Sequence, residues 1–121
     1  MKITNNFADH EFRCPCCGML SNSDAFIPFV ERLQKARDKA RIPFVITSGY
    51  RCPRHNAEIG GVPDSSHMKG IAADIRIRSN RERFLILNGL MYAGFRRIGV
   101  KHTYIHVDMD PDKSQFVTWL D

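Results

Sequence analysis

The chain has 121 residues, 43% of them hydrophobic and 26% charged, which suits one ordinary folded domain and excludes two separate cores. The formal net charge of +5 favours an acidic partner such as nucleic acid, a membrane surface or an anionic wall polymer. The alternative is that the charge only keeps the protein soluble. No apolar run approaches the ~20 residues that span a bilayer, and the N-terminus lacks the apolar stretch of a signal peptide. We expect one domain over residues 1–121, made in the cytoplasm and without a membrane span.

The first third of the chain predicts an irregular segment followed by a helix. Residues 1–22 carry turn-forming residues, and Phe7 and Phe12 are expected to anchor this segment to the body of the domain. A helical period starts near Asp24, which is a suitable N-cap. The expected buried stripe of the helix consists of Phe26, Phe29, Val30, Leu33, Ala36 and Ala40.

The four cysteines leave several interpretations open. They are Cys14, Cys16, Cys17 and Cys52. The C-x-x-C spacing from Cys14 to Cys17 is half of a structural zinc site, and Cys52 alone does not supply the other half. Reduced thiols near the N-terminus are an equally good interpretation, whereas a disulfide to Cys52 would be unusual in a reducing cytosol.

The remaining pattern predicts an α+β domain with a small antiparallel sheet and helices packed on it. The Ser79-x-x-Glu82 capping box begins a second helix, which we expect to bury Phe84, Leu87, Leu90 and Met91 and to end near Gly94. Strands are expected at residues 44–48, 74–77, 95–100, 103–109 and 116–120.

The strand at residues 103–109 alternates cleanly between apolar and polar side chains. Ile105, Val107 and Met109 should face the core, because alternate residues of a strand share a face. The opposite face then carries Tyr104, His106 and Asp108, together with His102 if the strand extends that far.

The segment from residue 47 to 74 joins two strands through a loop rich in Gly, Pro, Ser and Asn. Within it His67 precedes Asp74 by seven residues, and Asp74 begins a strand. Two imidazoles and a carboxylate, with His106 as the third member, form a divalent-metal site that leaves room for a water. The alternative is that these polar side chains belong to a solvated surface.

Several motifs occur together in a characteristic order: SGYR, N-x-x-x-GG, S-x-H-x-x-G-x-A-x-D and IHVD. The combination resembles the zinc D-Ala-D-Ala carboxypeptidase and endopeptidase superfamily, peptidase family M15, and most of all its short phage and prophage branch. The resemblance extends over roughly residues 7 to 119, nearly the whole chain.

This resemblance implies one catalytic Zn²⁺ held by His67, Asp74 and His106, with a water in the fourth position. Arg51 matches the family arginine that contacts the substrate or the developing oxyanion, a task suited to its permanently charged fork. Ser65 matches a position near the substrate, although a turn residue is an equal alternative. We also expect Tyr104, on the same strand face as His106, to contact the substrate.

The resemblance fails at the general base. Several relatives carry Glu or Asp three residues before the second ligand histidine, where this chain has Thr103. Asp108 is then favoured as the base, or as a group that orients a ligand imidazole, with His102 assisting proton transfer. His10 and His55 match no ligand position.

The expected function is a zinc metallopeptidase that cleaves peptidoglycan stem peptides or crosslinks, as an endolysin or a carboxypeptidase. It would act as a monomer, without nucleic acid, and would reach the wall through a holin or within a virion. One alternative is a non-catalytic virion or tail module that kept the fold, which Thr103 favours. A basic nucleic-acid-binding module that uses the cysteines ranks last, since no base-stacking pattern accompanies them.

Overall fold

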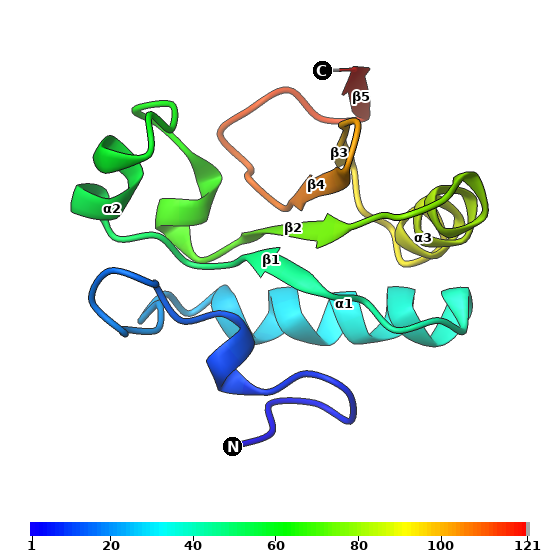
Figure 1. The fold of residues 1–121 in the computed structure, drawn as a ribbon, viewed down its shortest axis with the longest axis horizontal. Coiled ribbons are helices and arrows are strands. Elements are labelled where there is room, and N and C mark those ends of the chain that lie inside the picture. The colour runs from blue at the N-terminus through cyan, green and yellow to red at the C-terminus, as the bar shows by residue number, and fades with distance from the viewer. Residues whose placement is uncertain (121) are drawn as a thin grey trace.

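The computed structural model describes residues 1–120, and its central feature is a five-stranded sheet in the order β1-β2-β4-β3-β5 (Figure 1). The first four strands of this order pair antiparallel, while β5 runs parallel to β3. The α+β class of a single domain is therefore confirmed, with a mixed sheet. The bounds are β1 (Ile46–Ser48), β2 (Ala72–Arg76), β3 (Arg97–Val100), β4 (Tyr104–Asp108) and β5 (Val117–Leu120), all within two residues of prediction.

Two long helices, α1 (Phe26–Ala40) and α3 (Asn80–Tyr92), pack against each other and with the sheet enclose the core. The predicted stripe of α1 is buried from Phe26 to Ala40, but its predicted N-cap is wrong. The helix follows Ala25 rather than Asp24, and the N–H of Ala25 donates to the Ser23 hydroxyl at 3.2 Å. Within residues 1–120, no helix is long and apolar enough to cross a membrane.

The buried face of α3 differs from the prediction. Leu90 is buried, but Phe84 and Met91 are 68% and 56% exposed. The face that meets α1 instead contains Ile86 and Gly89, where a Cβ would lie 2.3 Å from a backbone oxygen of α1. This close approach of the two backbones fixes the rotation of α3 and turns Phe84 and Met91 outward.

The N-terminal segment is anchored as predicted. Phe7 and Phe12 are each 1% exposed, and their rings meet edge to face. Phe12 also lies directly against Gly49, where a Cβ would come within 2.7 Å of its Cα. The carbonyl of Phe12 accepts the N–H of Tyr50 at 3.0 Å. Residues 1–22 therefore hold in place the turn that follows β1 and leads to Arg51.

The long loop contains more regular structure than the sequence indicated. It includes the short helix α2 (Pro53–Glu58) and the 3-10 turn η2 (Ser66–Lys69), and a further 3-10 turn, η1 (Asp9–Glu11), lies in the N-terminal segment. Gly70, with φ of +73°, ends η2 and directs the chain into β2. The loop thus returns to the sheet with its polar residues beside β2 and β4.

Candidate metal centre

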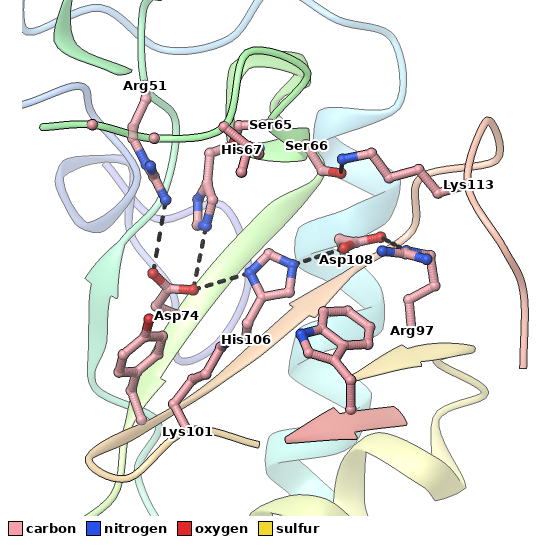
Figure 2. A pocket seen from close by; sticks show the side chains of 15 residues that line it. Arg51, Ser65, Ser66, His67, Asp74, Arg97, Lys101, His106, Asp108 and Lys113 are labelled. Atoms are coloured by element: carbon pink, nitrogen blue, oxygen red, sulfur yellow. Dashed lines mark hydrogen bonds and ion pairs between the residues drawn. The ribbon is translucent and has the colours of Figure 1, made fainter. Parts of the chain in front are cut away.

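A pocket of about 380 Å³ lies on one face of the sheet, where β2 and β4 run side by side. Asp74 and His106 are directly opposite each other in the register of these strands. His67, from η2, reaches the same point from above the sheet (Figure 2). One potential ligand atom from each side chain lies within 4.8 Å of the others, so the three predicted ligands come together.

The environment of His67 fixes which of its nitrogens is free. Its Nδ1 lies 2.8 Å from the carbonyl oxygen of Gly49, which only accepts, so Nδ1–H donates this bond. Nε2 then carries a lone pair. This atom is buried and lacks a hydrogen-bond partner, although it lies 3.2 Å from Oδ1 of Asp74. A buried nitrogen without a hydrogen-bond partner is suited to binding a metal ion.

His106 is oriented in the complementary way. Its Nε2 lies 2.7 Å from Oδ2 of Asp108, and Nε2–H donates because an ionised carboxylate only accepts. Its Nδ1 faces Oδ1 of Asp74 at 3.1 Å. Burial opposes protonation, but the hydrogen bonds to Asp108 and Asp74 outweigh it and raise the pKa of His106. The two carboxylates therefore favour a positive charge beside Asp74, which a proton on Nδ1, or a metal ion in its place, would supply.

The donor set fits a divalent cation. With Nδ1 of His67 and Nε2 of His106 as donors to other groups, a metal ion in place of any proton on Nδ1 of His106 would meet two imidazole nitrogens and one carboxylate oxygen. Ligands bound to zinc at ~2.0–2.1 Å in a tetrahedral arrangement lie roughly 3.3 Å apart, close to the separations here. Burial opposes ionisation of Asp74, yet His106 and His67 hold its pKa well below the usual range. His67, Asp74 and His106 thus form a candidate metal centre.

Asp108 belongs to the pocket lining but lies buried behind His106. Its side chain is 1% exposed and accepts from Nε of Arg97 at 2.7 Å, besides the bond from His106. The backbone N–H of Asp110 donates to it as well, at 2.9 Å. Burial raises the pKa of Asp108, but these donors outweigh that effect and lower it. Arg97, which sequence reasoning missed, also stacks over the ring of Trp119 at 4.9 Å.

The pocket wall is cationic. Arg51 extends toward Asp74 as Figure 2 shows, with Nη2 3.9 Å from Oδ2, and its Nη1 donates to Oδ1 of Asn56 at 3.1 Å. No motif indicated Lys113, whose ammonium donates to the Ser66 hydroxyl at 3.1 Å. The four cationic residues that line the pocket are Arg51, Arg97, Lys101 and Lys113.

The other predicted site residues divide into two groups. Tyr104 and Ser65 line the pocket, and the Ser65 hydroxyl accepts the N–H of His67 at 3.2 Å, which caps η2. His102 and Thr103 are exposed in the bend before β4 and do not line the pocket. Among residues 1–120, the only carboxylates in the pocket lining belong to Asp74 and the buried Asp108.

Comparison with known proteins agrees with this geometry. The sequence model of the family described as Peptidase M15 matches residues 5–108, which include all three converging side chains. No curated protein matches the chain.

Proposed function

Because the chain belongs to the peptidase M15 family, we propose that it is a zinc metallopeptidase that hydrolyses a peptide bond in peptidoglycan stem peptides or their crosslinks. The family match makes the chain a peptidase. The observation that supports a metal-dependent reaction is the convergence of two imidazole nitrogens on Oδ1 of Asp74.

His67, Asp74 and His106 would hold the zinc ion. Bound there, zinc supplies a Lewis acid for the scissile carbonyl and lowers the pKa of water toward neutrality. The protein contributes orientation: the Gly49 carbonyl sets the tautomer of His67, and Asp108 sets that of His106. The opposite nitrogen of each ring is thereby directed toward Asp74, where the metal would bind.

The cationic wall supports an anionic peptide as substrate. Peptidoglycan stem peptides carry free carboxylates, and an arginine fork binds a carboxylate through two parallel hydrogen bonds. Arg51 lies beside the metal centre with its side chain 11% exposed, so a substrate bound there would be largely desolvated. We assign Arg51 to the substrate carboxylate or to the oxyanion, and Tyr104 and Ser65 to the adjacent pocket surface.

We predict that Arg51→Lys lowers kcat/KM by about 10²-fold while metal content and thermal stability change little. Lysine keeps the charge but lacks the planar fork that reaches Asn56 and Asp74 together. Arg54→Lys is the matched control, since Arg54 is exposed on α2, does not line the pocket and pairs along its own helix with Glu58. Unchanged kinetics in Arg51→Lys would contradict a role in substrate binding and leave Arg51 only a structural ion pair with Asp74.

The proposed reaction is tested by incubating the purified protein with peptidoglycan and analysing the released fragments by mass spectrometry. We expect fragments from cleavage of a single type of peptide bond, their loss with a chelator, and recovery with added zinc. Released D-alanine would indicate a carboxypeptidase, and conversion of crosslinked dimers to monomers an endopeptidase. A metal-loaded protein that releases nothing would instead support the non-catalytic virion or tail module.

We further propose that the protein acts at the cell wall as a lysin of phage or prophage type. The net charge of +5 supports this assignment, because it favours approach to an anionic wall. Wall binding that weakens steeply with added salt would accompany this role.

A further inference from the structure

A second cluster of potential metal ligands is separate from the His-Asp-His site and consists of thiols. Sγ atoms of Cys14, Cys17 and Cys52 all lie within 4.8 Å of one another. Cys14 and Cys17 belong to the N-terminal segment, and Cys52 is the N-cap of α2. Cys14 and Cys52 are 38 positions apart in the sequence and meet here. In Figure 1 the N-terminal loop, drawn in blue, lies beneath the chain that leads into α2.

The backbone around the cluster is arranged for sulfur ligands. The N–H of Cys52 donates to Sγ of Cys14 at 3.4 Å, and the N–H of His55 donates to Sγ of Cys52 at 3.4 Å. Gly18 follows Cys17 with φ of +71°, and its N–H returns to the carbonyl of Cys14 at 2.8 Å. The tight turn presents the Cys14 and Cys17 thiols on one side, as in the C-x-x-C half of a structural zinc site.

These backbone donors favour the ionised form of Cys14, whereas for Cys17 the N–H of Met19 lowers the pKa but desolvation and the thiols of Cys14 and Cys52 outweigh it and raise that pKa. Burial raises the pKa of Cys14, but the N–H groups of Cys52, Cys17 and Cys16 outweigh it and lower that pKa to about 7. Desolvation and then contact with Cys52 raise the pKa of Cys16, so this thiol also lies next to the cluster. Thiolates, not thiols, bind metal ions.

We propose that Cys14, Cys17 and Cys52 bind a second, structural zinc ion that fastens the N-terminal segment to the start of α2. Thiolates bound to zinc at ~2.3 Å in a tetrahedral site lie about 3.8 Å apart, and the three sulfurs already lie within 4.8 Å of one another. The fourth donor comes from one of two flanking residues, Cys16 beside Cys52 or His55 three residues after it. The proposal does not depend on the peptidase reaction.

A metal explains the cluster better than a disulfide. One disulfide would use two of the three close sulfurs and leave the third beside it unpaired, whereas zinc uses all three. The four cysteines are free in the structure, and the sulfurs of Cys14 and Cys52 each accept a backbone N–H. Zinc itself is redox-inert, so binding it requires no change in the oxidation state of the three thiolates.

The location gives the ion a structural consequence. Cys52 directly follows Arg51 and caps α2, and α2 carries Asn56, the hydrogen-bond partner of Arg51. A metal at the cysteines would therefore limit motion of the segment that presents Arg51 to the pocket. Removing the ion should lower the thermal midpoint of unfolding by at least about 5 °C.

Metal analysis of the reduced, full-length protein tests the proposal. We expect two zinc ions per chain in the wild type and one in Cys17→Ser, with the His-Asp-His site still loaded. His67→Ala should lose the other ion and keep the thiolate one. Co²⁺ in place of zinc should give a thiolate charge-transfer absorption that Cys17→Ser lacks and His67→Ala retains, and Cys16→Ser and His55→Ala identify the fourth donor.

A measurement on the unmodified protein covers the case in which Cys17→Ser does not fold. The cysteines should resist alkylation until a chelator is added and should then react together. Wild-type protein with one zinc per chain, no thiolate absorption with Co²⁺, and cysteines that alkylate equally fast with or without chelator would overturn the proposal. Failure of peptidoglycan cleavage would leave these results unaffected, so the two proposals are tested separately.

Discussion

Replacement of His67 by alanine is expected to remove the metal from the His-Asp-His site and to abolish peptidase activity. The side chain is 2% exposed and supplies a nitrogen with no other partner. Loss of an outer hydrogen-bond partner of a ligand typically costs about 10–100-fold in metal affinity or activity, and loss of a ligand itself should cost more. Metal content per chain and the rate of peptidoglycan cleavage, measured on the same preparation, check this expectation.

Two further variants make the result specific. Asp74→Asn preserves the side-chain volume at the point where both imidazoles converge, so it should also lose metal and activity while the fold persists. His10→Ala, the same change as His67→Ala at an exposed position outside the pocket, should behave as wild type. Full metal loading and activity in both His67→Ala and Asp74→Asn would refute the assigned centre.

The parts of this structure that local patterns determine were predictable from the sequence. The stripe of α1 repeats at three- and four-residue steps, and Ile105 and Val107 alternate with His106 along β4. Both patterns arise because one face of each element is buried in the core. The meeting of His67, Asp74 and His106 followed from the order of motifs, and the register of β2 and β4 places two of them opposite each other.

Features that depend on how distant segments meet were not predictable. Helix α3 is apolar on several faces, so the period alone favoured Phe84 and Met91, whereas the close approach at Gly89 selected another face. The pairing of Arg97 with Asp108 depends on the register of β3 with β4. Likewise, nothing in the local sequence around Cys52 indicates that it lies beside the N-terminal cysteines.

Asp108→Asn is expected to weaken metal binding by about 10–100-fold and to lose most activity, because Asp108 positions His106. Oδ1 of Asp108 accepts from both Arg97 and the N–H of Asp110, while Oδ2 accepts from Nε2–H of His106. An asparagine would keep its oxygen toward the two donors and turn its NH₂ group toward His106. Nε2 must then become the acceptor, which moves the proton to Nδ1, the nitrogen that faces Asp74.

Metal affinity separates this role from that of a general base, which sequence reasoning left open for Asp108. A base that only accepts a proton from water would lose about 10²–10⁴-fold in rate on the same substitution while metal affinity stays near normal. The 1% exposure of Asp108 and its three donors favour the positioning role. Asp112→Asn is the matched control, since Asp112 is exposed and pairs with Lys69 outside the pocket.

The comparison with His102→Ala completes the test. His102 is exposed and outside the pocket lining, so its removal should leave both metal affinity and rate within about twofold of wild type, as for an exposed residue away from the site. The contrary pair of results, full activity in Asp108→Asn and none in His102→Ala, would assign proton transfer to His102. It would also require the bend before β4 to move toward the metal centre, because only such a movement would bring that imidazole to the substrate.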